Sequence, residues 1–229
     1  MISFIIIAKD LLINRKEMTE EFFELMTALL RVYQGCECII SDYGSTDGIK
    51  EVVTESYPRL DYLYTQPNEE HWLNIPKCLN NAVYKTEKTI IAPIGPDFRF
   101  TEEVIERIIS FFTSLGSIIL RPTCHYMGED DDVTLITHSP YALLKSTIIA
   151  SGGWDERMYA WGKEEDDLLS RIYKYQNICE VKVRGFGYVH LYHDNAFAEA
   201  WHEDPHNMLI AEENYHDNGK NLLNSYWER

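Results

Sequence analysis

Short apolar runs alternate with amphipathic helical stripes through the first half of this chain, and this alternation limits its fold more than any other feature. Runs rich in Ile, Val and Tyr predict strands at residues 2–8, 37–41, 62–65, 89–94, 117–121, 133–137 and 181–188. Helical spacing of apolar residues predicts helices at residues 17–33, 49–56, 75–85, 102–115 and 166–176. The order β-α-β-α-β-α-β predicts an α/β fold with a mostly parallel central sheet flanked by helices.

The length and composition indicate one domain. A chain of 229 residues with 45 % hydrophobic content can bury a substantial core, so we expect a single domain over residues 1–229, with a polar covering segment or lid at about 196–229. The five cysteines include no C-x-x-C pair, which is typical of reduced thiols and predicts a cytoplasmic location. The apolar run at 2–8 is too short to cross a membrane, so we expect no transmembrane segment.

The net charge of the chain limits the classes of binding partner that we expect. The formal net charge is −16, which repels a nucleic-acid backbone or an anionic membrane, so no nucleic-acid partner is expected. A chain this acidic that binds an anionic ligand, such as a nucleotide phosphate, is expected to recruit a cation.

Acidic residues follow two of the predicted strands. Asp42 lies in "SDYGSTDG" at the end of the second strand, and Asp97 lies in "GPDFRF" after the fourth. In parallel α/β sheets, ligands bind beyond the carboxyl ends of the strands, where a carboxylate can hold a polar group or a hard cation. The alternative for each residue is ordinary turn or capping chemistry.

Two further segments offer metal-binding chemistry. His190 and His193 are spaced i, i+3 after the last predicted strand, in "VHLYHD", and imidazoles with a carboxylate favour a borderline metal such as Mn²⁺. The alternative is a packed or surface histidine. Asp130 and Asp132, in "GEDDDV", form a rival pair, which we interpret as a solvated hairpin tip and leave out of the site.

Four consecutive carboxylates, Glu164 to Asp167, stand at a predicted helix start in "WGKEEDDLLSR". The helix dipole favours one or two acidic groups in a first turn, but it does not account for four. Crowded carboxylates raise one another's pKa, and a raised pKa suits a general base. The alternative is the acidic start of a solvated helix.

The order of these motifs resembles the GT-A-fold glycosyltransferases, in particular family-2-like enzymes and the catalytic part of β-1,4-galactosyltransferases and chondroitin polymerases. The longest match is "GGWDERMYAWGKEEDDLLSR", which is similar to the family element G-G-(F/W)-(D/N)-E-x₃-G-W-G-x-E-D-D-x-x-x-x-R. Upstream, "SDYGSTDG" resembles V-D-D-G-S-x-D, and "NIPKCLNNA" resembles N-R-A-K-x-x-N-x-G. The resemblance covers residues 2 to 195 and implies a GT-A fold.

On the donor side, the resemblance implies a nucleotide-sugar substrate, expected to be UDP-linked. Asp42 would accept a hydrogen bond from the uracil. The other implied donor-binding residues are Ala8, Ser45, Lys77 and Asn80. A Mn²⁺ or Mg²⁺ ion would be held by Asp97 together with His190 or His193, and it would act as a Lewis acid on the leaving diphosphate.

On the acceptor side, the resemblance implies a hydroxyl of a carbohydrate or glycolipid. Trp161 would form a platform for a sugar ring, with Trp154 also on the acceptor side. Glu165 takes the position of the catalytic base, and Asp166 that of the neighbouring acceptor-binding carboxylate. The implied mechanism is a single displacement that inverts the anomeric carbon. The sequence leaves open whether the base is Glu165 or Asp166.

The chain departs from the family pattern at four positions. Tyr43 and Ile75 replace an Asp and an Arg, Gly95 replaces the first Asp of D-x-D, and Glu165 replaces the Asp expected as base. These departures keep a second hypothesis open, a non-catalytic nucleotide-sugar-binding domain. A nucleotidyltransferase is a weaker alternative, because "AKDLLINRKE" lacks the glycines of a phosphate-binding loop.

Overall fold

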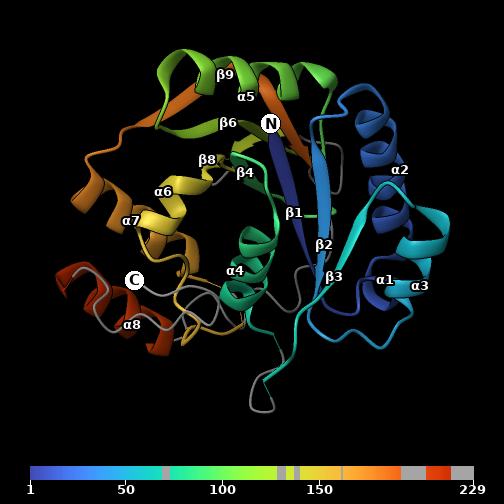
Figure 1. The fold of residues 1–229 in the computed structure, drawn as a ribbon, viewed down its shortest axis with the longest axis horizontal. Coiled ribbons are helices and arrows are strands. Elements are labelled where there is room, and N and C mark those ends of the chain that lie inside the picture. Colours follow the sequence, from blue (N-terminus) through green and yellow to red (C-terminus); the bar gives the residue numbers. More distant parts are fainter. Residues whose placement is uncertain (69–72, 128–132, 137–139, 161, 192–204, 218–229) are drawn as a thin grey trace.

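The computed structural model describes residues 1–68, 73–127, 133–136, 140–160, 162–191 and 205–217 (Figure 1). Its strands are β1 (Ile2–Ala8), β2 (Glu37–Asp42), β3 (Asp61–Tyr64), β4 (Ile90–Pro93), β5 (Phe98–Arg99), β6 (Ile119–Met127), β7 (Val133–Ile136), β8 (Leu143–Leu144) and β9 (Glu180–His190). Its α-helices are α1 (Leu11–Asn14), α2 (Lys16–Val32), α3 (Ile49–Glu51), α4 (Ile75–Lys85), α5 (Glu102–Leu115), α6 (Lys145–Ala150), α7 (Glu164–Gln176) and α8 (Pro205–Asp217). A π-helical turn, Val52–Ser56, continues α3.

The first sheet has the strand order β3-β2-β1-β4-β8. Its first four strands are parallel, and only β8 runs antiparallel, against β4. Six of the seven β1 residues are buried, as expected for a central strand that is covered on both faces. The parallel register places the carboxyl ends of β1, β2 and β3 side by side, with Ala8 level with Asp42 and Asp42 level with Tyr64.

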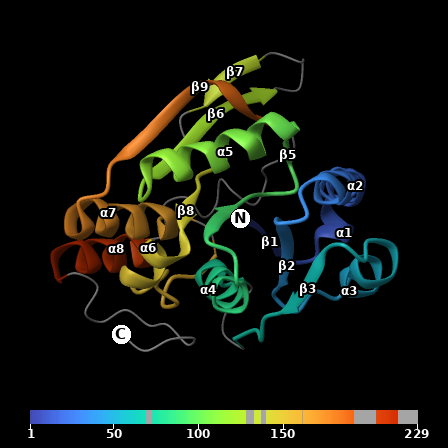
Figure 2. The ribbon, with the colours of Figure 1, turned by 45° about the horizontal axis from the view of Figure 1, so that its top comes forward.

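A second sheet, of order β5-β9-β6-β7, lies beside the first (Figures 1 and 2). Strands β6 and β9 are parallel, and a bulge between Pro122 and Thr123 breaks their register. Strand β5 pairs with the end of β9 and sets Phe98 opposite His190. This pairing brings the turn after β4 to the end of β9.

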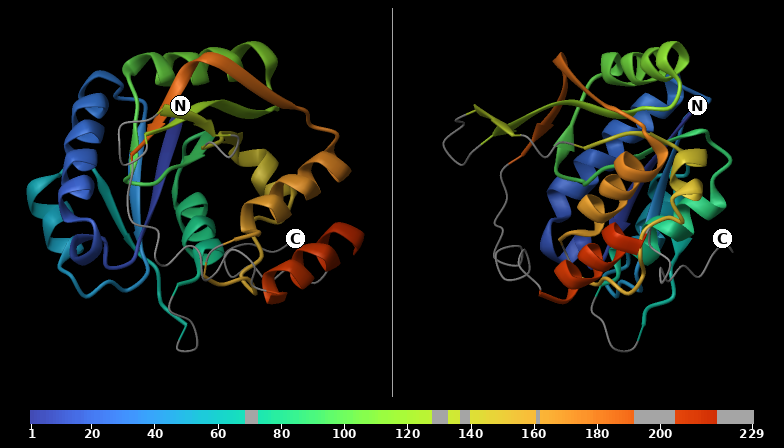
Figure 3. Two further views of the ribbon diagram at one scale, coloured as in Figure 1. Left: turned by 180° about the vertical axis from the view of Figure 1, so that it is seen from behind. Right: turned by 90° about the vertical axis from the view of Figure 1, so that its left-hand side faces the viewer.

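Helices cover both faces of the first sheet. One core cluster packs β1 residues such as Phe4 against α2 and α5, and the other packs residues such as Ile5 against α4, α6 and α7. Alternate side chains of a strand point to opposite faces, so neighbours on β1 enter different clusters. Figure 1 and the left view of Figure 3 place α6, α7 and α8 on the side of the molecule opposite α1, α2 and α3.

The predicted α/β class with a mostly parallel first sheet is confirmed, and the bounds of β1, α4 and α5 match the prediction. Four short elements, α1, α6, β5 and β8, were not predicted, and β6 and β9 are longer than expected because they pair with each other. Helix α8 falls within the expected covering segment at 196–229. In the described part of the chain, no helix is both long and apolar enough to cross a membrane.

Gly187 is packed so tightly that a larger residue has no room. It lies level with Thr123 just after the bulge, and a β-carbon at this position would overlap the Thr123 carbonyl. Because both groups belong to paired backbone, neither can yield without breaking the ladder. We expect Gly187→Ala to lower the free energy of unfolding by about 1–3 kcal/mol.

Denaturant unfolding checks this expectation, with Arg184→Ala as the control, because Arg184 is an exposed residue of the same strand. Equal midpoints for the two variants would contradict the packing argument.

Candidate active site

The loops that follow β1 and β2 are joined at the carboxyl edge of the first sheet. The Lys9 ammonium donates to the Gly44 carbonyl at 2.9 Å, and the Asp10 amide donates to Ser45 Oγ at 2.8 Å. In the other direction, the Thr46 amide donates to Asp10 Oδ1 at 2.7 Å. Ser45, an expected donor-binding residue, therefore links the two loops just beyond the ends of β1 and β2, which lie at Ala8 and Asp42.

Asp42 lies at this edge, but it is 2 % exposed. The Tyr62 hydroxyl donates to its Oδ2 at 2.6 Å, and the Ser45 amide donates to its Oδ1 at 2.9 Å. Both carboxylate oxygens are thus oriented by protein donors, and each retains a further acceptor site. Ala8 is fully buried, and its carbonyl accepts from the Tyr43 amide at 2.9 Å.

Lys77 and Asn80 both lie on α4, but they have different surroundings. Lys77 is half-buried, and its ammonium donates to Asn68 Oδ1 at 2.7 Å, next to the loop after β3. Asn80 is fully buried, donates to the Trp154 carbonyl and to Glu156, and accepts from the Trp154 amide. The expectation that Asn80 lines the donor cleft therefore needs correction, because its amide is used to fix the 154–156 segment.

Asp97 and His190, which are expected to hold a metal ion, lie side by side. The His190 Nε2 lies 3.4 Å from Asp97 Oδ2, and Arg15 reaches the same oxygen at 3.4 Å. Two neighbouring ligands of an octahedral ion with bonds of about 2.1 Å lie about 3.0 Å apart, so this carboxylate and imidazole fit a shared divalent cation. His193 lies outside the described residues, and within those residues no three His, Cys, Asp or Glu side chains cluster to hold a metal.

The acidic run forms the first turn of α7, and its first member closes the loop before the helix. Lys163, at the N-cap, has a φ of 71°, and Glu164 Oε2 accepts a hydrogen bond from the Gly162 amide at 2.7 Å. Burial raises the pKa of the Glu164 carboxyl to about 7. Glu164 therefore acts as a cap for the strained turn that precedes the helix.

Glu165 is held by Arg121, a partly buried arginine of β6. Arg121, with a side chain 10 % exposed, contacts Glu165 Oε1 at 3.0 Å and Glu180 at 2.5 Å. The Glu165 side chain is 38 % exposed as a whole, but its Oε1 is buried. Burial raises the pKa of this carboxyl to about 7, against the opposing effect of Arg121, and Glu164 and Asp166 raise it further. Such a carboxylate can take up a proton near neutral pH.

The remaining two acids of the run have opposite environments. The Asp166 side chain is 59 % exposed and pairs with Lys163 at 3.0 Å. Asp167 is buried and pairs with Arg171 at 2.6 Å, one turn along the helix. Asp166 is therefore available to a ligand, whereas Asp167 is part of the core.

Trp154, one of the two expected acceptor tryptophans, offers no ring face to a ligand. Trp154 is fully buried within the core cluster that contains α4, α6 and α7. Its expected place on the acceptor side therefore needs correction, because no face of its indole is exposed. Trp161 lies outside the described residues, as do Asp130 and Asp132.

A residue of α8 holds the backbone on both sides of position 161. Asn207, 2 % exposed, donates to the carbonyls of Tyr159 at 2.9 Å and Gly162 at 3.0 Å, and accepts from the Tyr159 amide at 3.3 Å. Between these contacts the backbone has positive φ angles, at Ala160 (59°) and Gly162 (112°). Such angles are costly for a residue with a β-carbon, so Asn207 stabilises a strained loop next to Glu165.

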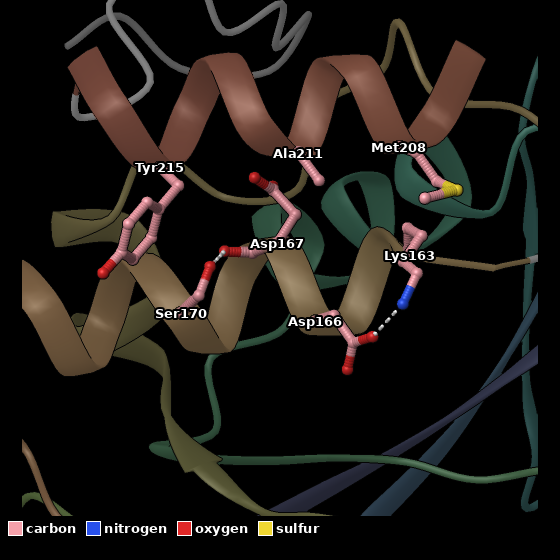
Figure 4. Close-up of a pocket in the computed structure, with 7 residues that line it drawn as sticks. All are labelled: Lys163, Asp166, Asp167, Ser170, Met208, Ala211 and Tyr215. Atoms are coloured by element: carbon pink, nitrogen blue, oxygen red, sulfur yellow. Dashed lines mark hydrogen bonds and ion pairs between the residues drawn. The ribbon is translucent and has the colours of Figure 1, made fainter. Parts of the chain in front are cut away.

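Two hollows flank the exposed side of α7 and share Asp166 and Ser170. One, of about 260 Å³, lies between α7 and α8 and is drawn in Figure 4, where Tyr215, Ala211 and Met208 of α8 lie opposite Ser170, Asp167 and Lys163. The other, of about 500 Å³, lies between α7 and the strands β6 and β9.

The candidate base and the candidate metal pair lie at different points along β6. Arg121 contacts Glu165, and Tyr126 is level with His190. Tyr126 lies five residues after Arg121 on the same strand. Five residues of a straight strand span about 16 Å. The backbone positions that carry the two groups are therefore separate along β6.

Sequence reasoning missed four residues that shape the site: Arg15, Tyr62, Arg121 and Asn207. Arg121 carried a weak signal, because it is a charged residue at the end of the apolar run "SIIL". Arg15 stands in the basic segment after the first strand. Asn207 carried no signal, since its partners are backbone carbonyls 45 and 48 residues away.

Removal of the Asn207 side chain tests its hold on the strained loop. Asn207→Ala leaves two partly buried carbonyls and one amide without their partner, so we expect the free energy of unfolding to fall by about 1–3 kcal/mol. Amide hydrogen exchange at residues 162–165 should also accelerate. Glu212→Ala, an exposed position on the same helix, is the control. Unchanged exchange at 162–165 in the Asn207 variant would argue against the loop-holding role.

Comparisons with known proteins agree on the fold. No protein-family model and no curated protein matches the chain. Among solved structures, S. aureus TarS 1–349 matches with a TM-score of 0.62 at 14 % identity, over 83 % of this chain and 60 % of that one. The complex of the same fragment with UDP-GlcNAc matches with a TM-score of 0.67 at 13 % identity, over 98 % and 68 %. The complex with UDP matches with a TM-score of 0.62 at 14 % identity, over 86 % and 62 %.

The chain thus spans about 60 % of the first TarS fragment's length. It has the α/β fold of the GT-A type, with a parallel-rich sheet flanked by helices.

Proposed function

We propose that this protein is an inverting glycosyltransferase, which moves a sugar from a UDP-linked donor to a hydroxyl of a carbohydrate or glycolipid acceptor. The observation that carries the proposal is Glu165, a carboxyl with a pKa raised to about 7 and fixed by Arg121 at the start of α7. A base of this pKa is partly ionised at neutral pH and still basic enough to accept a hydroxyl proton as the bond to it forms.

The donor would lie across the carboxyl edge of the first sheet. Asp42 is oriented there by Tyr62 and Ser45, and its remaining acceptor sites would receive the uracil imide. Ser45 and Lys77 would line the same place, and the fully buried Ala8 would contribute only the backbone at the end of β1. The fold likeness to TarS structures with UDP and with UDP-GlcNAc supports a nucleotide-sugar donor, although each is only 13–14 % identical to this chain.

A divalent cation, Mn²⁺ or Mg²⁺, would be held by Asp97 and His190, with His193 as a further candidate. The 3.4 Å separation of the carboxylate and imidazole supports this assignment. When bound, the ion would supply Lewis-acid stabilisation of the charge that develops on the diphosphate. Arg15 lies against the same carboxylate and would add positive charge at that end.

In the transfer step, Glu165 would remove the proton of the acceptor hydroxyl while that oxygen attacks the anomeric carbon from the face opposite the leaving diphosphate. Arg121 would keep the Glu165 carboxylate aimed at the acceptor and limit its rotation. Asp166, exposed on the same turn, would hold a second acceptor hydroxyl, and Trp161 would offer a ring face to the sugar.

A second candidate function is a nucleotide-sugar-binding domain without transfer activity. It is favoured by position 95, where the resemblance leads us to expect a carboxylate and the chain has glycine. A β-carbon on Gly95 would overlap Asp97 Oδ1, so a side chain at position 95 would require the Asp97 carboxylate to move. Turnover of UDP-sugars by the native chain distinguishes the two candidates.

Replacement of Glu165 tests the base. Glu165→Gln is expected to lower kcat at least about 100-fold while UDP affinity changes little, because a base acts in the transition state. In the native protein, kcat should rise with pH through about 7, since Glu165 must lose its proton before it can act. Steady-state kinetics across pH 5.5–8.5, a range of about 1.5 units either side of that value, measure both effects.

Glu164→Gln is the matched control, because Glu164 has the same side chain and a pKa also near 7 but caps the loop. In the Glu164→Gln variant, kcat should still rise with pH as it does in the native protein. A Glu165→Gln protein with normal turnover would rule out Glu165 as the base.

Replacement of Asp97 tests the metal site. Asp97→Ala removes the carboxylate of the pair with His190, so we expect the Mn²⁺-dependent part of UDP binding to disappear. Calorimetric titration with UDP, in Mn²⁺ and in EDTA, measures this part directly. Asp61→Ala makes the same change at the start of β3, away from the carboxyl edge, and should bind as the native chain does. Native-like Mn²⁺ dependence in the Asp97 variant would refute the assignment.

A further inference from the structure

The larger hollow beside α7 adjoins the candidate base but lies beyond it. It has a volume of about 500 Å³ and is lined by Arg121, Asp166, Leu169, Ser170, Tyr173, Glu180 and Lys182. Arg121 joins it to Glu165, because the same guanidinium contacts that carboxylate and lines the hollow. Its volume is within the range of small-molecule sites.

One face of α7 supplies a ring and polar groups to this hollow. Asp166, Ser170 and Tyr173 are spaced i, i+4 and i+7, so they lie along one side of the helix. Tyr173 is 39 % exposed, and its side chain lies close to the Glu180 carboxylate. An exposed aromatic ring beside carboxylate and hydroxyl oxygens matches the two sides of a sugar, an apolar ring face and a rim of hydroxyls.

The cations at the hollow are already paired with carboxylates. Arg121 contacts Glu165 and Glu180, and Lys182 lies 3.5 Å from Glu180. The charges that line the hollow, Arg121 and Lys182 against Asp166 and Glu180, sum to zero. An anionic ligand would have to break these pairs and approach Asp166, whereas a neutral ligand would leave them intact.

The smaller hollow, between α7 and α8, is less suited to a sugar ring. Its aromatic residue is Tyr215, and the Lys174 ammonium lies 3.8 Å from the centre of that ring. One face of the ring is thereby occupied, and the hollow has no contact with Arg121 among its lining residues (Figure 4).

We propose that the hollow between α7, β6 and β9 is an acceptor subsite that binds an uncharged sugar unit of a longer glycan, with Tyr173 as its ring platform. This inference rests on the proposed transferase function, since one sugar unit would lie in the hollow while the next presents its hydroxyl to Glu165 on the other side of Arg121. The acceptor would therefore have at least two sugar units. The unit in the hollow would carry no carboxylate, sulfate or phosphate.

The test measures binding of defined glycans to the full chain in the presence of UDP and Mn²⁺. The probes are three neutral trisaccharides, cellotriose, maltotriose and chitotriose, and one anionic trisaccharide, trigalacturonate, each followed by saturation-transfer NMR and calorimetry. We expect at least one neutral trisaccharide to bind and trigalacturonate to fail. Tyr173→Ala should weaken that binding about tenfold, and Tyr173→Phe should restore it, because the ring is retained.

Tyr84→Ala is the control, since Tyr84 is an exposed tyrosine of α4 that does not line the hollow. Circular dichroism shows whether each variant is folded. The inference is overturned if no neutral trisaccharide binds, if trigalacturonate binds as well as the neutral probes, or if Tyr173→Ala behaves like Tyr84→Ala.

UDP-sugar turnover by the native chain, measured in parallel, separates this inference from the proposed function. Turnover without binding of a neutral trisaccharide overturns the subsite alone. Tyr173-dependent glycan binding without any turnover supports the subsite and overturns the transfer reaction.

Discussion

The ion pair between Asp167 and Arg171 is the interaction on which the acidic turn of α7 depends. The Arg171 side chain is 1 % exposed, and it donates to the carbonyls of Ser151 and Gly153 as well as to Asp167. One guanidinium therefore ties the turn after α6 to the first turn of α7. Loss of one member of such a pair leaves an uncompensated buried charge, which is far more costly than the net stabilisation the pair provides. The position of α7 against the core follows from it, and with it the positions of Glu164 and Glu165.

The four carboxylates of that turn are separated by environment rather than by chemistry. Asp167 is neutralised in the core, Glu164 caps a strained turn, Asp166 faces solvent, and Glu165 is buried at its oxygen against Arg121. This separation explains how four neighbouring charges coexist, because each meets a different donor or cation. It also leaves one carboxyl whose burial outweighs its ion pair, the condition under which a carboxylic acid becomes a base of neutral pKa.

Periodicity in the sequence predicted the long elements because their pattern is local. The bounds of β1, α4 and α5 follow from apolar spacing alone, whereas β5 and β8 consist of two residues each and exist only through their partners. The meeting of Asp97 and His190 does not follow from apolar spacing, because it depends on the pairing of the two-residue strand β5 with the end of β9. The burial of Asn80 and Trp154 was not predictable, since it depends on how the 154–156 segment lies against α4. Arg121 and Asn207 act through contacts between distant segments that no spacing rule contains.

The hydrogen bonds from Asn207 to the loop before α7 determine when this loop can fold during synthesis of the chain. All strands of the first sheet lie within residues 1–144, and these residues emerge from the ribosome before α7 and α8. The loop at 159–162 cannot take its final hydrogen bonds until α8 has been synthesised some forty-five residues later. The carboxyl edge of the first sheet can therefore assemble early in translation, whereas the end of the candidate site that holds Glu165 is completed only after α8 has been synthesised. The order of synthesis thus keeps the acidic turn incomplete until the rest of the domain is in place.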